Sequence, residues 1–147
     1  MNALGPRRWI ALALAPLTMP LIYTAMLATD VTAGTRNPAG GVLVIFALGC
    51  VFSYLGTGAL LMPALVALSL FTTLTTLRAA LLGAVLGFVF YVPVAWLSWS
   101  SSGPDSGPPL DTFPQHFAGE LTDWGVWSFV VAGLVTAFVY WRLANSK

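Results

Sequence analysis

The stretch VLVIFALGCVFSYLGTGALLMPALVALSLFTTLTTL, residues 42–77, is 36 residues long and contains no charged side chain. As a single helix rising 1.5 Å per residue it would measure about 54 Å, whereas the hydrocarbon core of a bilayer is about 30 Å thick. The stretch is therefore long enough to cross a membrane with residues to spare. A break or an extension outside the membrane must take up the excess.

The composition of the whole chain points the same way. Of its 147 residues, 58% are hydrophobic and 7% are charged, whereas soluble domains carry about a quarter charged residues. Helices satisfy all of their backbone groups internally, so an apolar chain of this kind is expected to be an all-helical integral membrane protein. The length allows a single membrane domain, residues 1–147. The net charge of +1 and the lack of a basic patch argue against nucleic-acid binding.

Apolar runs and aromatic belts predict a bundle of four transmembrane helices. The expected spans cover residues 9–28, 42–62, 79–99 and 124–141. Pro63 is the expected break in the second run, because proline removes a helix hydrogen bond. Residues 64–77 are too short to cross again; we expect a helical extension and a tight turn, with an interfacial or re-entrant segment as the alternatives. Pro16 and Pro20 predict a bend in the first span, or a hinge with a carbonyl free for a ligand.

Charges predict the orientation of the four spans. The termini and the turn near residue 78 share one side, whose charged residues are Arg7, Arg8, Arg78, Arg142 and Lys147. The other side carries Arg36 with Asp30, Asp105, Asp111, Glu120 and Asp123. Because Lys and Arg concentrate in cytoplasmic loops, both termini are predicted to be cytoplasmic and loop 100–123 periplasmic or extracellular. A bacterial inner membrane is the expected location.

Small residues recur every four positions on two of the predicted spans. They are Gly49, Ser53 and Thr57 on the second span, and Ala79, Gly83 and Gly87 on the third. Membrane helices approach closely through such faces, because lipid provides no hydrophobic force to bring helices together. The two faces are predicted either to pack within this chain or to contact another subunit.

The outer loop ends in DTFPQHFAGELTDW, residues 111–124, which holds the only histidine of the chain, His116. Its residues Phe113, Phe117, Leu121 and Trp124 form an apolar stripe at helical spacing. We expect a short amphipathic helix that lies on the membrane surface before the fourth span. The predicted outer docking surface comprises Asp111, Phe113, His116, Phe117, Glu120, Leu121 and Asp123.

No catalytic, cofactor-binding or metal-binding site is predicted. Cys50 is the only cysteine and His116 the only histidine, so a cysteine redox pair and a bis-histidine haem are excluded. His116 with Asp111 and Glu120 is a weak pattern for a metal. The predicted spans contain no charged residue of the kind that proton-coupled transporters keep inside the bilayer. The serines near residue 100 form no hydrolase motif.

Two functions remain after these exclusions. The first is a non-enzymatic accessory, immunity or assembly subunit that binds another membrane protein through its small-residue faces and outer loop. The second is a small channel or transporter, which would be a homo-oligomer because four spans enclose little space. The expected partners are therefore the lipid bilayer and either another membrane protein or a second copy of this chain.

Overall fold

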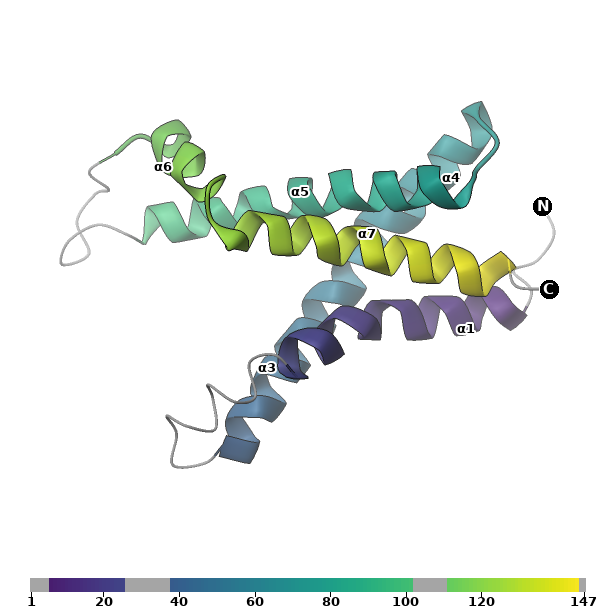
Figure 1. Ribbon diagram of the computed structural model, residues 1–147, viewed down its shortest axis with the longest axis horizontal. Helices are drawn as coiled ribbons and strands as arrows, with labels where there is room; N and C mark the ends of the chain where they lie inside the picture. Colours follow the sequence, from purple (N-terminus) through teal and green to yellow (C-terminus); the bar gives the residue numbers. More distant parts are fainter. Residues whose placement is uncertain (1–5, 26–37, 102–110, 146–147) are drawn as a thin grey trace.

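The computed structural model describes residues 6–25, 38–101 and 111–145, and the secondary structure in these ranges is helical throughout (Figure 1). The helices long and apolar enough to span a membrane are Arg7–Ala25, Ala39–Phe71, Thr76–Ser100 and Trp124–Asn145. The prediction of an all-helical chain with four such helices is confirmed. Residues 26–28, 30–37, 102–110 and Lys147, for which the sequence also gave predictions, lie outside the described residues.

The first long helix changes type at Pro16 without ending. α1 (Pro6–Leu14) passes into a 3-10 turn, η1 (Ala15–Leu17), and helical structure continues to residue 25. The hydroxyl of Thr18 donates a hydrogen bond to the carbonyl oxygen of Ala15 at 2.7 Å. Pro16 is fully buried, so the proline expected to bend this helix also fills space inside the molecule.

The second long helix runs through Pro63, which corrects the break predicted there. It consists of α3 (Pro38–Gly56), a π-helical segment η2 (Thr57–Leu61) and α4 (Met62–Phe71). In η2 the N–H of Met62 bonds to the carbonyl oxygen of Thr57, five residues earlier. Proline lacks an N–H and crowds the carbonyl four residues before it. The wider π turn accommodates this locally, and the helix continues for two more turns.

A tight turn joins this helix to α5 (Thr76–Ser100). Residues 64–77 were predicted to form a helical extension and a tight turn; the extension ends at Phe71, and the turn is complete before Thr76, earlier than predicted. Thr75 caps α5, because its hydroxyl accepts a hydrogen bond from the N–H of Arg78 at 3.3 Å. The guanidinium of Arg78 donates to the carbonyl oxygen of Thr73 at 2.7 Å. Ser69 and Thr72 donate to carbonyls of their own helix. These polar groups therefore close the turn.

α5 and α7 (Trp124–Asn145) lie side by side, and α1 packs along the C-terminal part of α7 (Figure 1). α6 (Phe113–Glu120) packs across the far end of α5. The helix Ala39–Phe71 crosses the others at a steep angle instead of lying alongside them (Figure 1). At about 1.5 Å per residue, its 33 residues measure about 50 Å. Because this helix is steeply inclined to the others, it extends less far along their direction than its full length.

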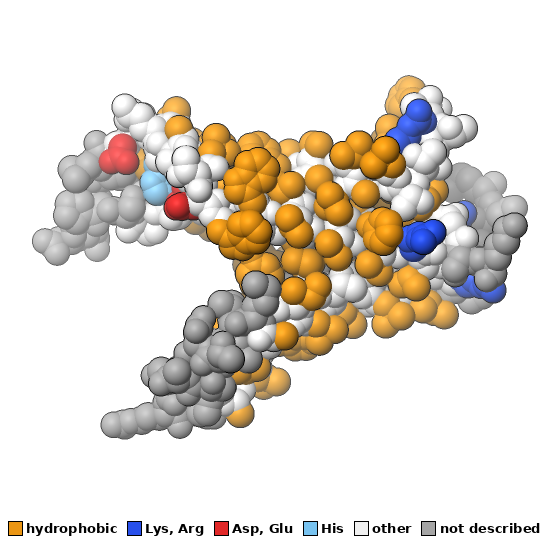
Figure 2. Space-filling view, viewed as in Figure 1, with side chains coloured by type: hydrophobic (Ala, Val, Ile, Leu, Met, Phe, Trp, Pro, Cys, Tyr) orange, Lys and Arg blue, Asp and Glu red, His pale blue; other side chains and the backbone are white. Residues whose placement is uncertain are grey.

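Charged side chains separate to opposite ends of the described structure. Arg8 borders the same surface hollow as Thr73 and Asn145, next to the α4–α5 turn. His116 and Glu120 lie at the other end, on α6. Figure 2 shows arginine side chains at one end, acidic groups and the histidine at the other, and hydrophobic side chains over the middle. The separation predicted from the sequence is thus present in the described residues.

Candidate functional site

A cavity of about 270 Å³ lies where the long helices cross. The first helix contributes Met19, Pro20 and Tyr23; α3 and η2 contribute residues between Ile45 and Leu61. α5 contributes residues between Gly83 and Phe90, and α7 contributes residues between Ser128 and Thr136. All four long helices therefore border one space.

Glycines on α5 and α7 form one wall by bringing two backbones together. A Cβ atom added at Gly83 would overlap the carbonyl oxygen of Gly133 and the side chain of Ala137. One added at Gly87 would overlap the carbonyl oxygen of Phe129. Ala79, at the start of the same face, is fully buried. The predicted face of the third span thus contacts the fourth span of its own chain.

The predicted face of the second span forms the opposite wall and is packed less closely. A Cβ atom added at Gly49 would lie 3.4 Å from Cβ of Pro20, which is an ordinary contact. Ser53 borders the cavity and is half-buried, while Thr57 is buried at the start of η2. The hydroxyl of Tyr54 donates to the carbonyl oxygen of Ala13, which ties α3 to the first helix.

The cavity is mainly apolar, and its hydroxyls are few. Ser128 donates to the carbonyl oxygen of Gly125 at 2.6 Å, so its proton is used within α7. Thr57 and Thr136 are also buried and border the cavity. Its described lining contains no Asp, Glu, Lys, Arg or His. The chemistry available there is mainly van der Waals contact with an apolar group.

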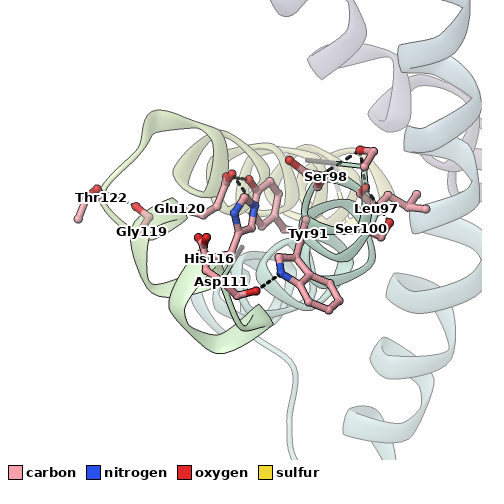
Figure 3. Close-up of polar contacts among 11 residues, drawn as sticks. Tyr91, Leu97, Ser98, Ser100, Asp111, His116, Gly119, Glu120 and Thr122 are labelled. Atoms are coloured by element: carbon pink, nitrogen blue, oxygen red, sulfur yellow. Dashed lines mark hydrogen bonds and ion pairs between the residues drawn. The ribbon is translucent and has the colours of Figure 1, made fainter. Parts of the chain in front are cut away.

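A second cluster lies at the C-terminal end of α5. The hydroxyl of Tyr91 donates a hydrogen bond to one oxygen of Glu120, and Nε2 of His116 lies 3.4 Å from the other oxygen (Figure 3). That distance fits an ion pair, although the geometry is not that of a hydrogen bond. Nε1 of Trp99 donates to the carbonyl oxygen of Asp111 at 2.9 Å. These contacts hold α6 against α5.

Aromatic packing strengthens the same attachment and corrects part of the predicted docking surface. Phe113 stacks edge-on against Trp96 and Trp99, and Phe117 against Phe88. These phenylalanines face α5 instead of forming an outer surface, because α5 offers aromatic partners at this level. α6 also ends at Glu120, so the predicted apolar stripe is interrupted before Leu121 and Trp124.

The other residues of the predicted docking surface lie around α6. Asp111, Leu121 and Asp123 are exposed, whereas His116 and Glu120 are half-buried. The carbonyl oxygen of Leu121 accepts a hydrogen bond from Trp127 at 3.2 Å. Within the described part of the chain no three His, Cys, Asp or Glu side chains are grouped so that they could hold a metal.

The sequence interpretation missed the contribution of the fourth helix to the cavity. Ser128, Gly133 and Thr136 are lining residues from α7. A signal was present, since Gly133 and Ala137 are four residues apart and match the spacing of Gly83 and Gly87. Comparisons with protein-family models, curated proteins and solved structures found no match. The site is therefore argued from the residues of this chain.

Proposed function

We propose that this chain is an integral membrane subunit that acts by binding another membrane protein. Its four long apolar helices would cross the bilayer, and the basic end, with both termini, would face the cytoplasm, since Lys and Arg concentrate there. Loop 100–123 would then be periplasmic or extracellular. A bacterial inner membrane fits this arrangement.

The packing of the helix Ala39–Phe71 carries the proposal. None of the residues in its most apolar 18-residue window is buried inside the chain, whereas 28% are buried in each of the other three long helices. Its exposed residues include an aligned set: Val44 (56% exposed), Leu48 (53%), Val51 (54%) and Leu55 (57%). Their spacing of i, i+4, i+7 and i+11 is that of a coiled-coil seam, in which side chains of one helix fill holes on another. This stripe is a suitable contact for a partner helix.

The partner contact can be tested by crosslinking in living cells. A photoreactive benzoyl-phenylalanine is placed at Val51 on the stripe or, as the matched control, at Val85, which is 59% exposed on α5. We expect one protein adduct of defined mass from Val51 and none from Val85. Adducts with lipid alone would contradict the proposal. An adduct only with a second copy would instead support the homo-oligomeric channel or transporter.

The orientation can be tested with a single engineered thiol. Cys50 is replaced by Ala and Lys147 by Cys, so that the C-terminal residue carries the only thiol. A membrane-impermeant maleimide is expected to label the variant only after the cells are opened. Labelling in intact cells would contradict a cytoplasmic C-terminus. A thiol placed at Asp111 is the reciprocal control, and its labelling is expected in intact cells.

A further inference from the structure

We propose that the cavity where the helices cross holds one acyl chain of a membrane phospholipid. This inference rests on the membrane insertion proposed above, but it does not depend on a protein partner. The cavity has a volume of about 270 Å³, is only partly enclosed, and is bordered by the first helix, by α3 with η2, and by α5 and α7. Once these helices cross a bilayer, the cavity would lie among lipid chains.

The lining selects a hydrocarbon over water or a polar ligand. Aliphatic contacts come from Met19, Leu60 and Leu86, and aromatic contacts come from Phe52, Phe90 and Phe129. Phe90 is in edge-on contact with Phe52 and stacks on Phe129. Apolar cavities of about 150 Å³ in proteins stay dry and bind benzene, so a larger cavity with this lining suits a longer apolar group.

The enclosure of the cavity favours a flexible chain over a helix. Its lining includes buried residues from all four long helices, among them Met19, Leu61, Gly83 and Thr136. An α-helix with its side chains is about 10–12 Å across. A partner helix on the stripe of α3 could lie next to the cavity, but it would not reach these buried residues. A lipid chain is narrow enough to do so.

Packing gives the physical reason why a lipid chain would occupy the cavity. Within a bilayer there is no hydrophobic force to collapse the cavity, and helices associate through van der Waals contacts. An empty space deprives the side chains that line it of those contacts. The glycine contacts between α5 and α7 fix one wall, and the π-helical segment brings Thr57 and Leu61 to the other. Because the α5–α7 wall cannot shift to close the space, an entering chain restores the missing contacts.

Photolabelling from the lipid side tests the proposal. The full chain is reconstituted into vesicles of phosphatidylethanolamine and phosphatidylglycerol containing a phosphatidylcholine with a diazirine midway along one acyl chain. After irradiation, labelled residues are mapped by mass spectrometry. We expect labelling of Leu60, Leu86 and Phe90 to exceed that of Val85 several-fold, although Val85 is the more exposed.

Two glycines two residues apart supply matched variants. Gly56 borders the cavity, and a Cβ atom there would lie 3.7 Å from the ring of Phe90, whereas one at Gly58 meets nothing within 4 Å. Gly56→Leu is expected to reduce cavity labelling several-fold, and Gly58→Leu to leave it unchanged. Ala132→Leu fills the cavity from α7 and decides the test if Gly56→Leu fails to fold.

Two results would overturn the inference: cavity labelling no greater than that of Val85, or unchanged labelling in a folded cavity-filling variant. Failure of membrane insertion gives a different result, since no residue on any long helix would then be labelled. Loss of the protein adduct at Val51 would overturn the partner proposal alone and leave the labelling pattern of the cavity intact.

Discussion

α5 and α3 both carry small residues every fourth position, yet they use them differently. On α5, Gly83 and Gly87 meet the backbone of α7 with no room for a methyl group. On α3, Gly49 meets only the ring of Pro20 at an ordinary distance, and neighbouring side chains remain exposed. Small-residue spacing therefore shows where a helix can be approached closely. Whether it is approached depends on the facing helix, and α7 alone supplies a matching glycine.

This contrast divides the molecule into a fixed pair and a loosely attached helix. The fixed pair, α5 with α7, carries the fully buried Ala79, Ala95, Val126 and Ala137. α3, the first part of the helix Ala39–Phe71, is tied to the first helix by Pro20 and by the hydroxyl of Tyr54. Further along the same helix, Leu61 and Leu65 are buried in the core. Because few contacts hold α3, its N-terminal half is the part of the described structure best placed to adjust to a lipid or a partner.

The largest expected effect comes from Gly133→Ala, which breaks the fixed pair. The new methyl group would overlap the carbonyl oxygen of Gly83, and backbone cannot move aside as a side chain can. Overpacking of this kind costs about 3 kcal/mol, and we expect a loss of that size in the free energy of unfolding. It is measured by denaturant titration in lipid nanodiscs with circular dichroism.

Gly58→Ala is the matched control for this change. Its methyl group meets nothing within 4 Å, and alanine is favoured over glycine in a helix by about 1 kcal/mol. The control should therefore be neutral or slightly stabilising. Equal losses at Gly133 and Gly58 would show that close approach of α5 and α7 is not what stabilises the pair.

The next largest effect is expected from Tyr91→Phe, at the end of the fixed pair that contacts α6. The change removes the hydrogen bond to Glu120 and leaves a half-buried carboxylate without that donor. Hydrogen bonds to charged groups contribute about 1.5–3 kcal/mol. We expect α6 to detach more readily, which hydrogen exchange of the amides of residues 113–120 would detect. Unchanged exchange would mean that the aromatic contacts alone hold α6.

Much of this architecture could be predicted from the sequence. The four long helices followed from uncharged runs. A helical extension and a turn followed from the shortness of residues 64–77, although the turn lies before Thr76 instead of near Arg78. The crossing of α3 did not follow, because it depends on which face of α7 the other helices occupy. Periodicity likewise revealed a stripe at Phe113 and Phe117. It did not reveal that Trp96 and Trp99 would cover it, since helical spacing gives a face but not its partner.

The cavity could not be predicted from the sequence for a related reason. It lies where Gly83 and Gly133 bring two helices together and where the π-helical segment of a third contributes Thr57 and Leu61. A π turn needs one extra residue per turn, and Pro63 marked only the neighbourhood of the change. Pairwise helix geometry, rather than any single motif, therefore produced the candidate site.

A smaller effect is expected from Tyr54→Phe, which tests the attachment of α3. The change removes a hydroxyl that donates to a backbone carbonyl between α3 and the first helix. A hydrogen bond between uncharged groups contributes about 1 kcal/mol. We expect a loss of that size or less in the denaturant titration used for Gly133→Ala. A loss as large as that of Gly133→Ala would mean that α3 is as firmly fixed as the α5–α7 pair.

Gly49→Ala should have the smallest effect and gives the sharpest contrast with Gly133→Ala. The added methyl group would lie 3.4 Å from Cβ of Pro20, which needs no displacement of backbone. Alanine also favours the helix over glycine, so the change in the free energy of unfolding is expected within about 0.5 kcal/mol of zero. The same substitution would then cost little on α3 and much on α7, although both glycines border one cavity. A loss at Gly49 as large as at Gly133 would mean that α3 is held as closely as α5. α3 could then not shift to accommodate a ligand or a partner.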